Sequence, residues 1–178
     1  GWIALHSGMA AGAHAVLIPE IPFDLGPVAA TIQQREERGA KFSIVVVPEG
    51  ATPHDGDVTT EGKAVGQAEQ LGGIGAKVAA GLHELTGKET RTVVLGHLLR
   101  GGTPTSIDRI LGLRFGAAAV RALETGHNGV MVSLDPPHVT YVPLVGATHR
   151  MKSVPLDGDT VVTARDLGIN FGDRMPLP

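Results

Sequence analysis

The chain has 178 residues, which is enough for one domain with a sizeable core. Its formal net charge of -3 argues against a general nucleic-acid or membrane-surface binder. The absence of cysteine excludes disulfides and cysteine metal sites, and it fits a cytoplasmic protein. The most apolar stretch, residues 3–23, is interrupted by His14 and Glu20, so we do not expect it to span a membrane.

Four short runs along the chain are rich in β-branched residues and almost continuously apolar. Such runs are typical of strands that are covered on both faces, as in a parallel sheet. Helical patterns lie between them, and this alternation predicts an α/β fold, layered α/β/α, with a mainly parallel sheet. In chain order we expect a strand at 15–18, a helix at 25–38, a strand at 43–47, a helix at 73–85, a strand at 92–95, a helix at 105–123 and a strand at 130–134.

The other segments carry weaker patterns. Residues 51–71 are polar and rich in Gly, Thr and Asp, so we expect a long surface loop there. After Val154 the pattern fades, although residues 163–168 suit a last helical turn. Residues 1–5 have the composition of the inside of a folded element, and we expect the true beginning of the protein to lie upstream of them.

Residues 90–109 are the most informative stretch for chemistry. They predict a buried strand that ends near Gly96, a tight turn through two glycines, and a helix that starts near Thr105. Asp108 follows Thr105 at the spacing of a capping box. In open α/β sheets ligands bind at the carboxyl ends of the strands, and a helix N-terminus adds free N–H groups.

Arg91, His97 and Arg100 bring hydrogen-bond donors to this same region, so the segment predicts a site for a phosphate ester. The alternative is that these arginines are solvated, or paired with Glu89 and Asp108, as surface arginines usually are.

A second candidate is Glu49, which closes an apolar strand and is followed by a polar loop. A carboxylate there can accept two hydroxyl hydrogen bonds, which suits a sugar ring. The alternative for Glu49 is a helix cap or a surface salt bridge. Glu20 follows the first strand in the same manner, and there we favour a structural role.

Several segments, in order from Gly1 to about Pro155, resemble the 6-phosphofructokinase family. Residues 1–5 and 17–20 look like the part that follows the family's Met-Gly-Arg motif, and residues 47–50 resemble the strand end that carries its sugar-binding glutamate. Residues 88–109 resemble its fructose-6-phosphate segment, and that match is long and specific. The general character is that of the bacterial branch that contains both ATP- and pyrophosphate-dependent enzymes.

The resemblance implies a role for each candidate. Glu49 would accept hydrogen bonds from fructose hydroxyls, His97 and Arg100 would hold the 6-phosphate, and Arg91 would reach that phosphate from a neighbouring subunit. The reaction would transfer a phosphoryl group from ATP or pyrophosphate to the 1-hydroxyl of fructose 6-phosphate, with Mg²⁺ bridging the donor phosphates. The resemblance also implies a homo-oligomer with a shared active site, and no nucleic-acid or membrane partner.

The resemblance also suggests how the chain is divided. We expect a fructose-6-phosphate-binding core over 1–100, a helix and strand segment over 101–155 that packs on a missing N-terminal domain, and a C-terminal tail over 156–178. Together these would be part of a two-domain phosphofructokinase fold.

Some family features are absent from the sequence. It has no Gly-Gly-Asp donor-phosphate loop, no Thr-Ile-Asp-x-Asp segment with the general base, and no Met-Gly-Arg motif. We therefore expect no catalytic residue and no metal ligand in this chain, and no activity from the 178 residues alone. Leu99 stands where the family usually has Gln. His14 stands where regulated bacterial members commonly carry an acidic residue, and Ala40 where they carry Lys, so familiar effector control is not expected.

Three hypotheses follow. The chain is part of a kinase without its N-terminal half, or a non-catalytic sugar-phosphate-binding module, or another α/β enzyme that acts on a phosphorylated metabolite. The length of the encoding reading frame separates the first two, and fructose 6-phosphate binding tests the third.

Overall fold

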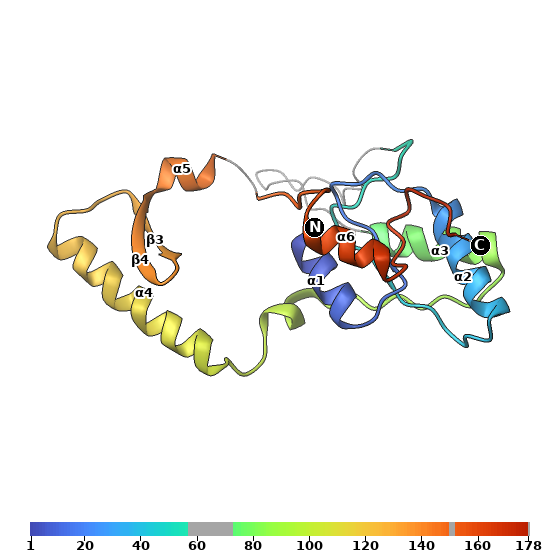
Figure 1. The fold of residues 1–178 in the computed structure, drawn as a ribbon, viewed down its shortest axis with the longest axis horizontal. Coiled ribbons are helices and arrows are strands. Elements are labelled where there is room, and N and C mark those ends of the chain that lie inside the picture. The colour runs from blue at the N-terminus through green and yellow to red at the C-terminus, as the bar shows by residue number, and fades with distance from the viewer. Residues whose placement is uncertain (57–72, 150–151, 178) are drawn as a thin grey trace. The chain divides into compact units, whose positions relative to one another are not determined.

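The computed structural model describes residues 1–56, 73–149 and 152–177 (Figure 1). They form two compact units, which we call unit 1, Gly1–Val94 with Ser153–Pro178, and unit 2, Leu95–Lys152. Most of the predicted loop at 51–71 lies outside the described residues. Residues 51–56, which are described, follow the strand β2, Val45–Val46, and make a parallel bridge between Pro53 and Phe23.

Unit 1 is built around a short parallel strand pair. The strands β1, Ala15–Val16, and β2 pair with Ala15 opposite Val45 and Val16 opposite Val46. On the other side of β1, Asn170 forms a further parallel bridge to Ala15. The elements of unit 1 are α1 Trp2–Ala10, β1 Ala15–Val16, α2 Leu25–Glu37, β2 Val45–Val46, α3 Ile74–Thr86 and α6 Asp159–Asp166.

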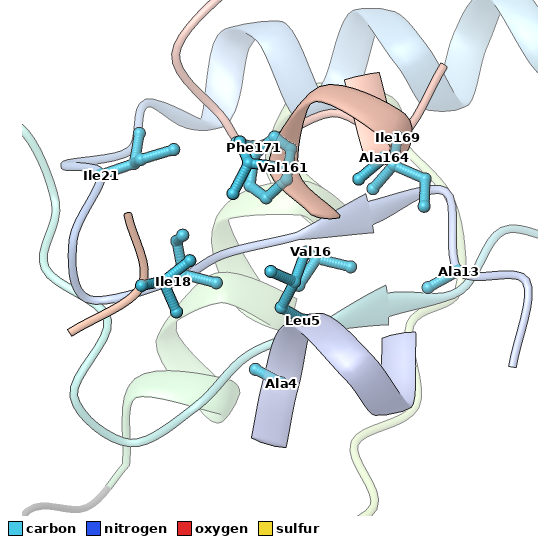
Figure 2. Close-up of a cluster of buried hydrophobic side chains, with 11 residues drawn as sticks. Ala4, Leu5, Ala13, Val16, Ile18, Ile21, Val161, Ala164, Ile169 and Phe171 are labelled. Atoms are coloured by element: carbon cyan, nitrogen blue, oxygen red, sulfur yellow. The ribbon is translucent and has the colours of Figure 1, made fainter. Parts of the chain in front are cut away.

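Successive residues of β1 and its extension face opposite layers. Val16 and Ile18 belong to one core cluster, which also contains Leu5 of α1 and Val161 of α6 (Figure 2). Leu17 belongs to a second cluster, formed with α2 and α3 through Val28, Ala29, Ile74, Val78 and Leu82. Because side chains alternate along a strand, helices cover both faces of the pair. The predicted α/β/α layering is therefore confirmed in unit 1.

The helix boundaries of unit 1 follow local signals. The helix predicted at 73–85 is α3, and it ends at Gly87, whose φ of 68° lies in the left-handed region that favours glycine. The helix predicted at 25–38 is α2, which begins after Asp24, whose side chain accepts a hydrogen bond from the Gly26 N–H. The sequence pattern is weak after Val154, but the chain forms α6 in this region and Phe171 is buried in the core.

Unit 2 combines one long helix with a β-hairpin. Its elements are the 3₁₀ helix η1 Gly96–Arg100, α4 Ser106–Glu124, β3 Val130–Asp135, β4 His138–Pro143 and α5 Leu144–Thr148. β3 and β4 are antiparallel, and β4 was not predicted. α4 lies on the hairpin, where the Tyr141 hydroxyl donates to the Ala118 carbonyl at 2.8 Å and Arg114 donates to the Pro137 carbonyl at 2.6 Å.

The predicted strand at 92–95 is wrong for this chain. These residues have no ladder partner among the described residues, and the side chains of Val93 and Val94 are 77% and 79% exposed. A β-branched run becomes a strand only when a neighbouring strand satisfies its N–H and C=O groups. Here the run instead leads out of unit 1 and into η1.

No helix in the described part of the chain has the length and apolar character needed to cross a membrane.

Candidate functional site

The carboxyl ends of β1 and β2 lie side by side, because the two strands are parallel. The turns that follow them touch: a Cβ placed on Gly50 would lie 3.2 Å from Cγ of Pro19. Each turn carries a glutamate, Glu20 after β1 and Glu49 after β2. The two carboxylates have different surroundings.

Glu20 has a structural partner. Its Oε1 accepts a hydrogen bond of 2.9 Å from the Val154 N–H, which fixes the chain where it re-enters unit 1. Glu49, in contrast, is exposed in a turn that the Ala51 N–H closes on the Pro48 carbonyl at 3.0 Å. Its carboxylate makes no hydrogen bond or ion pair with any described residue, so no cap or salt bridge from that part of the chain uses its acceptor oxygens.

Arg91 is on the exposed segment that follows α3. Its Nη2 and Nε atoms lie 2.8 and 2.9 Å from Oε1 of Glu89, so the pairing that we gave as the alternative is present. Both side chains are highly exposed, at 84% and 76%. Such a pair contributes about 0–1 kcal/mol, so a phosphate dianion would compete with Glu89 at little cost.

His97 and Arg100 lie on η1 at positions i and i+3. A 3₁₀ helix has about three residues per turn, so side chains at this spacing lie on the same face. Both residues are exposed, and neither has a hydrogen-bond or ion-pair partner among the described residues. Gly101 and Gly102 follow, and the φ of 102° at Gly102 requires glycine. The segment thus presents two donors of phosphate-binding type together on unit 2.

The N-terminus of α4 carries the predicted capping box. Oδ2 of Asp108 accepts hydrogen bonds of 2.8 Å from both the Oγ1 and the backbone N–H of Thr105. The Asp108 N–H in turn donates to Oγ1 of Thr105 at 3.2 Å. These bonds, first that from the Thr105 side chain and then that from its backbone, lower the pKa of Asp108. Because a carboxylate already occupies this helix end, a phosphate site in this segment would depend on His97 and Arg100.

The four predicted residues are divided between the two units. Glu49 and Arg91 belong to unit 1, and His97 and Arg100 belong to unit 2. Chemically they are one acceptor for hydroxyl groups and three donors for an anion.

One pocket of unit 1 is lined by none of these four residues. It has a volume of about 260 Å³ and lies at the first turns of α2 and α3, next to Phe23, Pro53 and His54. Phe23, Ile74 and Val78 of the second core cluster line it together with the polar residues Asp24, His54, Asp55 and Lys77, and the sequence patterns do not indicate it.

A family model described as phosphofructokinase matches residues 1–123, which include all four predicted site residues. The chain belongs to the phosphofructokinase family. It is 48% identical over 177 residues to an "ATP-dependent 6-phosphofructokinase" of Chloroflexus aurantiacus, an alignment that covers 98% of this chain and 48% of that protein. It is also 48% identical to "ATP-dependent 6-phosphofructokinase 3" of Streptomyces coelicolor, over 87% of this chain and 46% of that protein.

Among solved structures, the chain is similar to a "pyrophosphate-dependent phosphofructokinase" from Marinobacter aquaeolei. The TM-score is 0.68 at 21% identity, with 100% of this chain and 47% of that chain covered. At this identity the similarity shows the fold. The chain spans about half the length of the curated phosphofructokinases that it matches.

Proposed function

We propose that this chain is the C-terminal part of a 6-phosphofructokinase and that it binds fructose 6-phosphate. The observation that carries the proposal is the family match over residues 1–123, because this range contains every residue that we assign to the substrate. In the whole protein the reaction transfers a phosphoryl group to the 1-hydroxyl of the sugar, as a step of glycolysis.

The proposed roles follow from the charges and contacts of the side chains. His97 and Arg100 bind the 6-phosphate from one face of η1, and Glu49 accepts hydrogen bonds from the fructose hydroxyls. Arg91 reaches the phosphate of a neighbouring subunit's site after releasing Glu89. These contacts position the acceptor hydroxyl, and positioning is a large part of catalysis in phosphoryl transfer.

In this proposal the phosphoryl donor binds to the rest of the protein, which also supplies the general base. ATP is the favoured donor, because relatives that are 48% identical are named ATP-dependent, whereas the pyrophosphate-dependent structure is 21% identical. Mg²⁺ would neutralise the donor phosphates. The described residues contain no group of three His, Asp or Glu suited to a metal ion. The enzyme would be a cytoplasmic homo-oligomer, and this chain alone would be inactive.

We also propose that the segment expected to pack on the missing N-terminal domain, residues 101–155, does so through α4. One side of α4 carries Ala118 and Ala122, which are the buried side chains of unit 2 among its described residues. The other side carries Ile110, Leu113 and Val120, all exposed. An apolar face of this kind on a 19-residue helix is typical of an interface.

Calorimetric titration of the whole protein tests the substrate assignment. Arg100→Ala should weaken fructose 6-phosphate about 30- to 1,000-fold and leave fructose unaffected, because only the phosphorylated sugar makes the charge-assisted bond. Glu49→Gln should instead weaken both sugars, because it removes acceptor charge at the ring.

Arg121→Ala is the matched control. It removes the same charge from an exposed position of the same unit, at the other end of α4. If Arg100→Ala binds fructose 6-phosphate as tightly as the Arg121→Ala control, the site assignment is wrong. If the full-length protein binds the sugar phosphate but transfers no phosphoryl group with either donor, the chain belongs to a non-catalytic sugar-phosphate-binding module.

A further inference from the structure

His14 lies at the entrance to the β1–β2 pair and makes an unusual contact there. Its Nδ1 atom is 2.9 Å from the backbone N–H of Ile44, the residue just before β2. The His14 N–H donates to the Ile44 carbonyl at 2.9 Å, so the two residues are joined by a main-chain bond and a side-chain bond. The imidazole thereby takes the place of a main-chain acceptor and adds one rung to the ladder.

This rung matters because the ladder is short. β1 and β2 have two residues each, and Leu17 donates to the Val46 carbonyl at 2.9 Å at the far end of the pair. On the opposite side of β1, the His14 carbonyl accepts a hydrogen bond of 3.0 Å from the Asn170 N–H. His14 is thus the residue through which β2, β1 and the C-terminal loop are linked at this edge.

The rung exists in only one protonation state. The Ile44 N–H is a donor, so Nδ1 must be an unprotonated acceptor, and the neutral ring carries its proton on Nε2. His83 has the opposite arrangement: its Nδ1 lies 2.6 Å from the Lys88 carbonyl, to which it can only donate. Protonation breaks the bond of His14 and preserves the bond of His83.

The surroundings of His14 also favour its neutral form. The Arg35 guanidinium of α2, which bonds Ser43 Oγ at 3.3 Å, is the charged group that acts on the ring. The segment before β2 presents the Phe42 ring, 6.5 Å away in an edge arrangement, and the C-terminal loop presents a backbone N–H. Partial burial, and then Arg35, lower the pKa of His14 from its ordinary value of 6.5.

We propose that His14 is a pH-sensitive positioning residue, whose neutral imidazole holds the start of β2 on β1 and releases it when protonated. β2 runs through Val47 and Pro48 directly into the turn of Glu49. Release at its start therefore loosens the support of the carboxylate that we assign to the sugar. This consequence for the sugar rests on the proposed function.

The sign follows from linkage. The neutral form is favoured by folding, so the contribution of His14 is complete above its ordinary pKa of 6.5 and is lost as the pH falls from that value through the lowered pKa of the folded protein. Between about pH 7.5 and about pH 5.5, the equilibrium constant for pairing of the start of β2 with β1 falls by at most about tenfold. At one pH unit below its ordinary pKa the released imidazole is about tenfold more protonated than neutral.

Hydrogen exchange and NMR titration of the protein test this. The ring nitrogens of His14 should titrate below pH 6.5, with the Nε2–H tautomer present above the midpoint. After correction for intrinsic exchange, the hydrogen-exchange protection of the Ile44 amide should fall several-fold, up to about tenfold, between about pH 7.5 and about pH 5.5. In His14→Asn this loss should disappear, because Oδ1 of Asn stands as many bonds from the backbone as Nδ1 and does not titrate. His14→Phe should lack the protection at every pH.

His6→Asn is the control, because it removes an exposed histidine whose ring lies 5.2 Å from that of Trp2, in a tilted arrangement, within α1, and it should keep the pH dependence of the parent. A His14 midpoint at or above 6.5 would overturn the proposal, and so would equal pH dependence of Ile44 in His14→Asn. The titration of the parent protein decides the question even if His14→Asn does not fold.

Fructose 6-phosphate is the second readout. Binding to the whole protein should weaken in acid, and His14→Asn should remove part of that decline. The comparison cancels the ionisation of the ligand phosphate itself. An equal decline in both proteins would overturn the coupling of His14 to Glu49. Failure of the sugar phosphate to bind at either pH would overturn the proposed function instead and leave the exchange result standing.

Discussion

Units 1 and 2 have similar amounts of regular structure and very different interiors. Unit 1 has two core clusters, one on each face of β1, and side chains as large as Phe171 and Leu5 are completely buried in it. In unit 2 the buried side chains among the described residues are Ala118 and Ala122. Hydrogen bonds and caps are enough to define a helix and a hairpin, but burial of apolar area supplies most of the stability. Unit 1 therefore carries its own core, whereas unit 2 has two buried alanines among its described residues and, in our proposal, completes its packing through an interface.

The largest expected effect tests this contrast directly. Phe171→Ala should lower the free energy of unfolding of the 178-residue chain by about 3–5 kcal/mol, because it leaves a cavity in a closed core. Leu113→Ala, in the middle of α4 with a side chain 76% exposed, should change it by less than about 0.5 kcal/mol. Urea unfolding followed by circular dichroism measures both.

The same two substitutions in the whole protein sharpen the contrast. If the outer face of α4 is buried there, Leu113→Ala should cost about 2–5 kcal/mol, as a buried leucine does. If Leu113→Ala leaves the free energy of unfolding of the whole protein almost unchanged, the interface that we propose for α4 is wrong.

A medium effect is expected where the C-terminal loop is fixed to α6. Arg165 donates to both carboxylate oxygens of Asp173, at 3.1 and 2.7 Å, and its guanidinium lies 4.9 Å from the centre of the Phe171 ring. Arg165→Ala should lower the free energy of unfolding by about 1–3 kcal/mol, and Arg165→Lys should recover only part of it, because Lys cannot bond both oxygens.

Arg174→Ala is the control on the same carboxylate, because Arg174 is 74% exposed and lies 3.6 Å from Asp173. It should cost less than about 0.5 kcal/mol in the same denaturation experiment. Equal losses for Arg165→Ala and Arg174→Ala would mean that the bidentate bond adds nothing to the free energy of unfolding of unit 1.

The smallest effect is expected at the capping box of unit 2. The hydrogen bonds from Thr105 lower the pKa of Asp108 from its ordinary value of 3.8. The contribution of the cap is therefore complete above that value and is lost as the pH falls through the lowered one. Asp108→Asn should reduce the NMR-detected helix content at the start of α4 near neutral pH and match the parent in strong acid. A difference that persists unchanged in strong acid would show that the charge of Asp108 has no part in the cap.

Local features of the fold were predictable from the sequence, and pairings were not. Gly87 and the Thr105–Asp108 spacing act within a few residues, so they define helix ends without reference to the rest of the chain. The run at 92–95 has the composition of a strand but lacks a neighbour to bond. β4 was missed although Val139 and Tyr141 alternate with polar residues, because that signal follows a pair of prolines.

The candidate site shows the same division. The types of residue at positions 49, 91, 97 and 100 predict a sugar-phosphate site, since charge and donor capacity belong to single residues, and that site stays a prediction. The sequence did not reveal that η1 would present His97 and Arg100 on one face. Nor did it reveal that Glu20 would be used by Val154, because that contact joins distant segments.

The inclusion of Leu5 and Phe171 in one core cluster has a consequence for the order of events during synthesis. The first residues of unit 1 leave the ribosome long before residues 161–171, with the whole of unit 2 made in between. Until then Val16 and Leu5 lack the side chains that cover them, and the nascent chain displays an unfinished hydrophobic surface. Completion of unit 1 is therefore a late, long-range closure, and such closures are the slow steps of folding. A pause in translation within unit 2 would prolong the interval in which this surface is exposed and can bind chaperones or aggregate.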